Sequence, residues 1–337
     1  MVLRSSLINA FLERAGWIDT RRSLISSDAS FRRYERLYNN HKTVILMDAP
    51  APEENVAAFI KITEHLTKLG YSVPQIFAQD INLGFLLLED FGDNTFTNAL
   101  AVGIDEKKIY QTAVDVLIDL HGRQLSEAAP DCLESYDKEK LIAEVVLFVD
   151  WYVNGLFGKD FSEEVKSDFL CIWDKILSNI SFEHETLVLR DFHVDNLMWL
   201  PDRGGIRKCG LLDYQDAVKG HPTYDLMSLL EDARRDLKPG MSGNLLDYYY
   251  EALPKFDRNV FNKIYSILSA QRHCKVIGIF SRLAMRDGKS NYLNHIPRCW
   301  SLLERVCSTP ELKILDDWLK SNILPEKRTS FSWKQGL

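Results

Sequence analysis

Residues 187–197 read Leu-Val-Leu-Arg-Asp-Phe-His-Val-Asp-Asn-Leu, and this stretch decides which fold the chain is expected to adopt. Asp191 is followed by Asn196 five residues later, and Asp213 comes seventeen residues after Asn196. Phosphoryl transfer uses one carboxylate to orient the acceptor hydroxyl, and an amide and a second carboxylate to hold the metal ions. The H-R-D-x-x-x-x-N pattern, followed by a D-F-G-type aspartate, supplies these groups in this order. The spacing therefore predicts a phosphoryl-transfer site, with Leu189 in place of the usual histidine.

The residues between Asn196 and Asp213 predict a β-hairpin. Two short apolar runs, 197–200 and 209–212, flank residues 201–205, which are rich in turn-forming residues. A hairpin would return Asp213 to the side of Asn196. An aspartate and an asparagine five residues apart often occur by chance, whereas a loop, a hairpin and a returning aspartate in this order rarely do.

Further motifs extend this pattern over most of the chain. They are residues 28–34 (DASFRRY), 44–50 (VILMDAP), 84–92 (GFLLLEDFG) and 220–226 (GHPTYDL). With the loop, they resemble the aminoglycoside phosphotransferase and choline kinase family. The resemblance is greatest to a bacterial branch that includes the anomeric kinases of N-acetylmuramate and N-acetylglucosamine.

The resemblance implies an α+β, bilobal, protein-kinase-like fold. Residues 1–92 are expected to form an N-lobe with a small antiparallel sheet and one main helix. Residues 93–325 are expected to form a larger, mostly helical C-lobe with the catalytic loop and the acceptor pocket, and 326–337 a tail. The implied cofactors are ATP and Mg²⁺, with Asp191 as the catalytic residue and with Asn196 and Asp213 as metal ligands.

The nucleotide-binding side departs from the usual kinase pattern. The turn at 26–30 contains no glycine, although Ser30 can offer a hydroxyl to phosphate, and the strand at 43–48 contains no lysine. We expect Arg32 or Arg33 to supply the missing positive charge, because a guanidinium binds phosphate through two parallel hydrogen bonds. The alternative is an ordinary hairpin with both arginines in solvent.

Other candidates follow from the resemblance. The stretch from Glu89 to Gly92, including Phe91, matches the connection between lobes, whose backbone binds the adenine edge. The acceptor candidates are Glu144, Asp150 and Trp151, from their positions on the helix expected at 138–155, and Asp216. Glu144 and Trp151 recur in the related branch, where they fit either a pocket wall or a support of the fold, and Asp216 is equally suited to assist the metal site or to cap the next segment. Asp225 is expected to hold the catalytic loop through its backbone. Among Arg272, Arg282 and Arg286, one is a candidate to meet an acidic acceptor.

The overall composition fits a soluble cytoplasmic enzyme. The chain has 337 residues and a net charge of −7, which argues against general nucleic-acid binding because that requires a basic face. Its six cysteines lack C-x-x-C spacing, which favours reduced core thiols. Neither a signal peptide nor an apolar run of membrane-spanning length is evident.

We therefore predict an ATP- and Mg²⁺-dependent small-molecule kinase whose acceptor is the anomeric hydroxyl of an N-acetylated amino sugar. One alternative acceptor is an aminoglycoside or a choline-like alcohol. A different alternative is a kinase-like binding protein without activity, which the missing lysine and the missing glycine-rich loop favour. A protein kinase is disfavoured, because no Ala-Pro-Glu segment follows Asp213.

Overall fold

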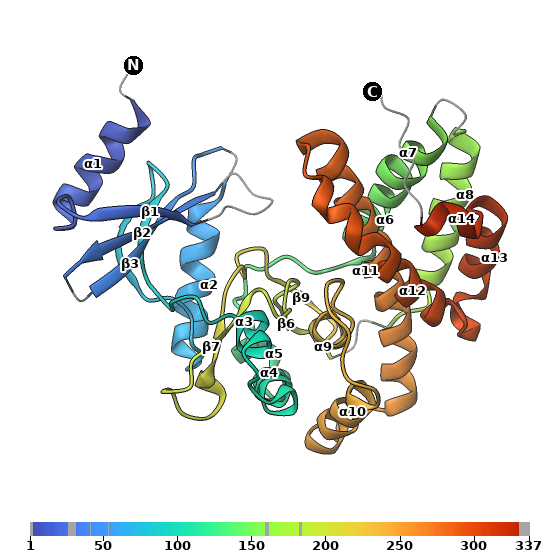
Figure 1. Ribbon diagram of the computed structural model, residues 1–337. Coiled ribbons are helices and arrows are strands. Elements are labelled where there is room, and N and C mark those ends of the chain that lie inside the picture. Colours follow the sequence, from blue (N-terminus) through green and yellow to red (C-terminus); the bar gives the residue numbers. More distant parts are fainter. Residues whose placement is uncertain are drawn as a thin grey trace. The chain divides into compact units, whose positions relative to one another are not determined.

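The computed structural model describes residues 3–25, 32–40, 42–52, 54–158, 162–181 and 184–329 (Figure 1). The chain forms two compact units, and each combines segments that are distant in sequence. Unit 1 contains residues 1–116 and 194–217, and unit 2 contains residues 117–193 and 218–337. The boundary thus passes through helix α4 (Glu106–Gly122) and through the loop that contains Asp191 and Asn196. The lobe boundaries expected from the sequence stay a prediction.

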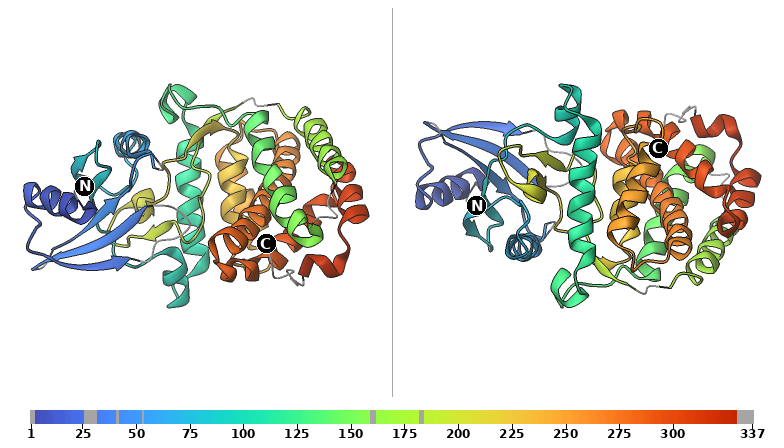
Figure 2. Two further views of the ribbon diagram at one scale, coloured as in Figure 1. Left: turned by 90° about the horizontal axis from the view of Figure 1, so that it is seen from above. Right: turned by 90° about the horizontal axis from the view of Figure 1, so that it is seen from below.

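Unit 1 is built on a five-stranded antiparallel sheet with the order β1-β2-β3-β5-β4. Its central strands β3 and β5 are rich in apolar residues, and all of Phe85 to Leu88 is buried. Helix α1 packs against the sheet through Ile8, Phe11 and Leu12 (Figures 1 and 2). The strands are β1 (Arg21–Ile25), β2 (Arg33–Asn39), β3 (Lys42–Asp48), β4 (Ile76–Asp80) and β5 (Phe85–Glu89), and α1 is Arg4–Arg14.

Helix α2 (Val56–Lys68) is the main helix of unit 1, as the sequence predicts. It begins at Asn55, whose side chain accepts a hydrogen bond from the backbone N–H of Ala58 and so satisfies one of the free donors of the first turn. The expected hairpin is confirmed, because β7 (Leu197–Trp199) pairs with β8 (Cys209–Leu211) in an antiparallel ladder. Unit 1 also contains α3 (Phe96–Ala101) and a 3₁₀ turn, η3 (Gly205–Lys208).

Unit 2 is mainly helical and is organised around one long helix, α11 (Arg258–Asp287), which packs against α6, η1, α9 and α12 (Figure 1). A two-stranded ladder of β6 (Thr186–Val188) and β9 (Val218–Gly220) flanks the loop that contains Asp191. The other helices are α5 (Leu125–Ala128), α6 (Lys138–Leu147), α7 (Asn154–Phe157), α8 (Glu163–Leu177), α9 (Thr223–Leu230), α10 (Met241–Ala252), α12 (Ile296–Cys307), α13 (Lys313–Asn322) and α14 (Pro325–Thr329), with short 3₁₀ turns η4 (Ser290–His295) and η5 (Pro310–Leu312).

Two local features shape the contact between α11 and α6. Gly278 lies against the end of α6, where a Cβ atom at position 278 would be 2.3 Å from the carbonyl carbon of Leu147. Only glycine therefore allows α11 to approach this closely. Directly after Leu147, the chain adopts a π-helix, η1 (Phe148–Val153), a rare form that occurs most often near functional sites.

The predicted fold class is confirmed: an antiparallel sheet with one main helix in unit 1, and a mostly helical unit 2. Among the described residues, we find no helix that is both long and apolar enough to span a membrane.

Candidate active site

The hairpin in unit 1 brings Asn196 and Asp213 together. At its base, the backbone N–H of Leu212 donates to the carbonyl of Asn196 at 2.9 Å. The Asn196 side-chain amide in turn donates to Oδ2 of Asp213 at 3.4 Å. Asp213 has a left-handed backbone with φ of 58°, a conformation that costs a non-glycine residue free energy and that concentrates at functional sites. The structure therefore places these two predicted metal ligands side by side.

Helix α2 fixes the residue that follows Asp213. The Tyr214 hydroxyl hydrogen-bonds the Thr63 hydroxyl at 2.8 Å, and its ring stacks on Phe59 with the centroids 5.3 Å apart. Both partners belong to α2, and the Tyr214 side chain is buried. The position of Asp213 is therefore tied to the main helix of its own unit.

Arg32 contacts Asp213, one of the two predicted metal ligands. Its Nη2 atom lies 3.1 Å from Oδ1 of Asp213, and its Nε atom lies 3.3 Å from Oε2 of Glu54, just before α2. Burial opposes the charge of Arg32, but the negative potential of Tyr34, Asp213 and Glu54 outweighs this and raises its pKa above the ordinary value. Of the two candidate arginines, Arg33 is instead exposed at the start of β2.

Ser30 and Asp216 are two further site residues that the sequence predicts. Ser30 lies outside the described residues. Asp216 accepts a hydrogen bond at 3.0 Å from the Gln215 amide, which also donates to Oδ1 of Asp213 at 3.1 Å. Gln215 therefore links Asp216 to the predicted metal ligand within unit 1.

The oxygen atoms that Asn196 and Asp213 offer in unit 1 fit the ligand preference of Mg²⁺. Magnesium prefers oxygen ligands and is usually held by one or two carboxylates together with waters and substrate phosphates. Asn196 and Asp213 provide an amide oxygen and a carboxylate at one point. Among the described residues, we find no group of three or more His, Cys, Asp or Glu side chains that could hold a metal on its own.

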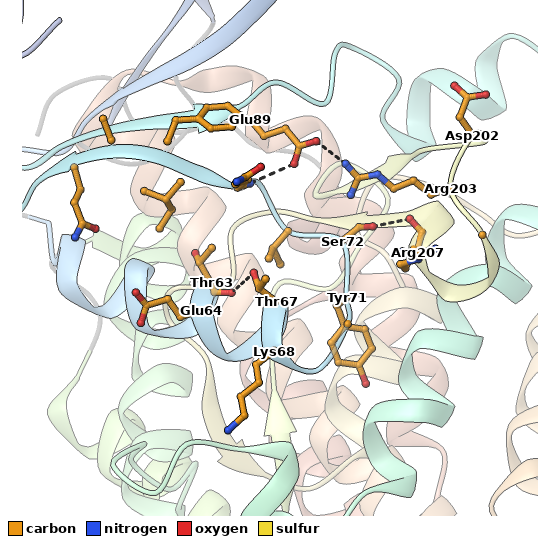
Figure 3. Close-up of a pocket in the computed structure, with 18 residues that line it drawn as sticks. Thr63, Glu64, Thr67, Lys68, Tyr71, Ser72, Glu89, Asp202, Arg203 and Arg207 are labelled. Atoms are coloured by element: carbon orange, nitrogen blue, oxygen red, sulfur yellow. Dashed lines mark hydrogen bonds and ion pairs between the residues drawn. The ribbon is translucent and has the colours of Figure 1, made fainter. Parts of the chain in front are cut away.

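The side chain of Glu89 faces a cavity of about 1060 Å³ that is formed by α2, β4 and the connection between β7 and β8 (Figure 3). Its Oε1 accepts a hydrogen bond from Arg203 at 2.6 Å, and its Oε2 accepts one from the backbone N–H of Gln75 at 3.3 Å. The guanidinium of Arg203 also lies over the ring of Phe91, 4.8 Å from its centroid. The side chains of Glu89 and Phe91 thus hold the β7–β8 connection, and their role in nucleotide binding stays a prediction.

In unit 2, Asp225 holds the loop that leads to Asp191. Its two carboxylate oxygens accept hydrogen bonds from the backbone N–H groups of Leu189 (2.6 Å) and Arg190 (2.9 Å). This confirms the role implied by the resemblance. Burial raises the pKa of Asp225 to about 7, although the two backbone hydrogen bonds favour the ionised form. Arg190 has a left-handed backbone with φ of 70°, which these bonds help to maintain.

Asp191 lies among positive charges. The Arg272 side chain, from α11, places Nη2 at 3.4 Å from Oδ1 of Asp191 and donates from Nη1 to the carbonyl of Arg190 at 2.9 Å. Desolvation alone would raise the pKa of Asp191, but the charges of Arg272, Lys275, His193 and Arg190 hold it well below its usual range. Asp191 is therefore an ionised carboxylate at neutral pH.

Glu144 has its oxygens occupied by side chains of its own unit. It accepts hydrogen bonds from Lys275 at 2.8 Å, from Gln271 at 3.0 Å, and from Tyr136 and Arg190. Burial alone would raise the pKa of Glu144, yet the charges of Lys275 and Arg190 lower it to about 2. The observed contacts make Glu144 a support for Arg190, and contact with an acceptor stays a prediction.

The remaining acceptor candidates are dispersed over unit 2. Trp151 is half-buried in η1, and Asp150 forms an ion pair with Lys166 in α8 at 2.5 Å. Arg286 pairs with its neighbour Asp287 at 2.7 Å, and Arg282 is half-buried on α11. Contact of these side chains with an acceptor stays a prediction.

Sequence reasoning missed several residues that the structure brings to these sites. The sequence around Glu54 gives no sign of its partner, because its contact with Arg32 depends on the fold. Lys275 and Gln271 had a signal that was not used: polar side chains in the middle of a helix whose other residues are mostly apolar are often partners in a buried network. Glu54 and Gln215 contact predicted site residues within unit 1, and Lys275, Gln271 and Tyr136 contact Glu144 within unit 2.

The fold and these groups first define a class, that of phosphoryl-transfer enzymes with a protein-kinase-like fold. The chain belongs to the phosphotransferase enzyme family, whose sequence profile matches residues 21–258. It is accordingly an enzyme that phosphorylates a hydroxyl group, and membership in this family implies a nucleotide donor and a divalent metal ion. The resemblance found in the sequence is confirmed.

Curated relatives and solved structures agree with this assignment. The chain is 33% identical to an N-acetylmuramate/N-acetylglucosamine kinase of Caulobacter vibrioides, over 95% of this chain and 96% of that protein. It is 35% identical to a protein of the same name from Pseudomonas aeruginosa, over 88% of this chain and 87% of the relative. A choline kinase from Streptococcus pneumoniae has a similar fold, with a TM-score of 0.62, 13% identity and coverage of 90% of this chain and 99% of that one.

Proposed function

We propose that this protein is a cytoplasmic kinase that uses ATP and Mg²⁺ to phosphorylate the anomeric hydroxyl of N-acetylmuramate or N-acetylglucosamine. The observation that carries the proposal is the similarity, over nearly the whole chain, to relatives that are named as kinases of these two sugars. The presence of Asp191, Asn196 and Asp213 supports an active enzyme, because a chain that had lost phosphoryl transfer would be free to lose these groups.

Asp191 orients the acceptor hydroxyl and accepts its proton. Its carboxylate is ionised and therefore a weak base, but in a loose phosphoryl-transfer transition state the acceptor proton is released late. Correct placement of the hydroxyl then contributes more to the rate than basicity does. The surrounding cations, which depress the pKa of Asp191, are compatible with this role.

Asn196 and Asp213 hold Mg²⁺, which neutralises charge on the phosphates when it is bound. Arg32 supplies the positive charge that most kinases take from a strand lysine. Its contacts with Asp213 and Glu54 support this role, since a kinase lysine also pairs with a helix glutamate close to the metal-binding aspartate. This observation weakens the argument for an inactive binding protein, which rested on the missing lysine.

Backbone groups of residues 89–92 bind the adenine in this proposal, and Ser30 offers its hydroxyl to the phosphates. Glu144, Trp151 and Asp216 are the acceptor-side candidates. Glu144 acts indirectly, by holding the Arg190 side chain, because its carboxylate already accepts four hydrogen bonds.

The test is an assay of ADP release from ATP and Mg²⁺ with each of the two sugars as acceptor. The matched control is the 1-O-methyl glycoside of N-acetylglucosamine, in which only the anomeric hydroxyl is blocked. We expect turnover with both free sugars and none with the glycoside. Equal turnover of the glycoside would contradict anomeric phosphorylation, and turnover only with an aminoglycoside or choline would contradict the sugar acceptor. Magnesium-independent ATP binding without turnover of any acceptor would favour the inactive binding protein.

A further inference from the structure

Arg190, the residue before Asp191, has hydrogen bonds at both its backbone N–H and its backbone carbonyl. The N–H of Arg190 donates to Asp225, and its carbonyl accepts from Arg272 at 2.9 Å and from the Ser228 hydroxyl at 3.4 Å. Arg190 is an arginine in a left-handed conformation, which is strained for a side chain of this size and persists only where the surroundings enforce it. The partners of these two backbone groups come from two helices, α9 and α11.

Arg272 differs from the other partners because it also reaches the carboxylate of Asp191. One guanidinium nitrogen binds the carbonyl of Arg190, and another lies 3.4 Å from Oδ1 of Asp191. The planar guanidinium therefore connects the backbone of one residue with the side chain of the next. A lysine ammonium has no fixed fork of donors and would not hold both oxygens in one orientation.

Arg272 is itself fixed in place. Its side chain is only 9% exposed, and its guanidinium lies over the Tyr224 ring, 5.4 Å from the centroid. The Tyr224 hydroxyl is shared between Arg272 (3.3 Å) and Lys275 (3.4 Å). Tyr136 packs edge-on against Tyr224, with the centroids 4.9 Å apart. A side chain with so little freedom loses little entropy when it holds a neighbour.

The charges that face Asp191 come from three elements. Arg272 and Lys275 lie on α11, Arg190 and His193 lie in the loop itself, and Asp225 lies on α9. Burial lowers the pKa of His193 below its ordinary value. Lys275 and Arg190 also pair with Glu144, whereas Arg272 contacts the carboxylate of Asp191 itself.

We propose that Arg272 is a positioning residue for Asp191: it fixes the rotamer of the carboxylate that orients the acceptor hydroxyl. This inference rests on the proposed role of Asp191 in phosphoryl transfer. It has two consequences. Loss of Arg272 disorders the carboxylate and therefore lowers kcat, without changing the nucleotide site. It also removes a neighbouring positive charge, so that Asp191 protonates at higher pH and the acid limb of the pH–rate profile moves upward.

The experiment compares Arg272→Met, Arg272→Lys and the control Arg258→Met with the wild-type chain. Arg258 lies on the same helix but pairs with Asp247 on the surface. We expect Arg272→Met to lower kcat about tenfold to a hundredfold, the effect of losing one charge-assisted hydrogen bond, with the KM for ATP unchanged. Its acid limb should move to higher pH. Arg272→Lys should restore the acid limb but only part of kcat, and Arg258→Met should match the wild type.

A second measurement uses no substrate. Backbone amides of residues 189–191 should exchange hydrogen faster in both Arg272 variants than in the wild type or in Arg258→Met. Unchanged kcat and unchanged exchange in Arg272→Lys would overturn the proposal, even if Arg272→Met did not fold. A lower melting temperature with a normal kcat per folded molecule and a normal pH profile would show a purely structural role. If the wild type transfers no phosphate, the proposed function fails, while the exchange rates still report on the contact.

Discussion

Asp191 in unit 2 and Asp213 in unit 1 are almost equally exposed, at 39% and 40% of the side chain, but they are held in different ways. The loop before Asp191 is fixed through backbone groups, by Asp225 and Arg272. The Asp213 carboxylate is contacted by three side chains of its own unit, Asn196, Arg32 and Gln215, whereas Arg272 contacts the Asp191 carboxylate at 3.4 Å. The loop of Asp191, with its fixed backbone, is prepared to orient a substrate, whereas the Asp213 carboxylate must exchange some of its partners when a metal ion binds.

The largest expected effect comes from removing each carboxylate in turn. We expect Asp191→Asn to lower kcat about 10³-fold, or about 4 kcal/mol, because the acceptor hydroxyl loses its orienting base. Binding of ATP with Mg²⁺ should persist. Asp213→Ala should lose turnover as well, but here because metal-dependent nucleotide binding is lost. Turnover assays and calorimetric titration with ATP, with and without Mg²⁺, separate the two outcomes.

The control for both variants is Asp202→Asn, in the exposed turn between β7 and β8, which should behave as the wild type. Near-normal turnover in either Asp191→Asn or Asp213→Ala would refute the role assigned to that residue. Loss of nucleotide binding in Asp191→Asn would contradict the different roles assigned to Asp191 and Asp213.

A second test concerns stability and the support behind Asp191. The pKa of Glu144 in the folded protein is about 2, below its ordinary value of 4.5, so Glu144 stabilises the fold above pH 4.5. This contribution, about 3 kcal/mol, is lost as the pH falls from 4.5 towards 2. Urea unfolding at several pH values should show Glu144→Gln to be less stable than the wild type at pH 7, with the two converging at low pH.

Glu134→Gln provides the matched control, because Glu134 is an exposed carboxylate that pairs with Lys140 at the surface. Such pairs contribute about 0–1 kcal/mol, so this variant should follow the wild-type curve. If Glu144→Gln also remained parallel to the wild type down to pH 2, the buried network around Glu144 would not be the source of acid sensitivity.

The smallest of the three effects concerns the charge that replaces the strand lysine. Arg32→Gln should raise the KM for ATP about tenfold to thirtyfold, or about 2 kcal/mol, because a charge-assisted contact near the phosphates is lost. Arg33→Gln is the matched control, since Arg33 is exposed at the start of β2 and should change the KM little. Equal behaviour of the two variants would contradict the assignment to Arg32, and an effect of Arg33 alone would transfer the role to Arg33.

The motif around Asp191 could be predicted because covalent spacing determines it. The spacing of five positions from Asp191 to Asn196 and the hairpin that returns Asp213 are local features. Sequence order and turn chemistry were therefore sufficient to predict them. The choice between Arg32 and Arg33 was left open, because strand alternation gives opposite faces to the two residues but does not say which face meets Asp213.

The contacts that join distant segments could not be predicted in the same way. Arg272 lies more than eighty residues after Arg190 in the sequence, and only the packing of α11 in unit 2 brings its guanidinium to that carbonyl. Glu144 was a candidate for the acceptor pocket because it matches a pattern of the related branch, and that pattern fits a support of the fold equally well. Its four hydrogen-bond donors depend on which faces of α6 and α11 meet, a property of the whole helix pair.

Gly278 makes the packing of α6 and α11 sensitive to substitution, although it has no polar side chain. A methyl group there would overlap the backbone at Leu147, so α11 would have to move away from α6. Lys275 and Gln271, one and two turns earlier on α11, would then separate from Glu144, and Arg272 would move with them. Attempts to redesign which acceptor the enzyme accepts should therefore leave position 278 as glycine, since an apparently harmless enlargement there would reach the catalytic loop through the helix itself.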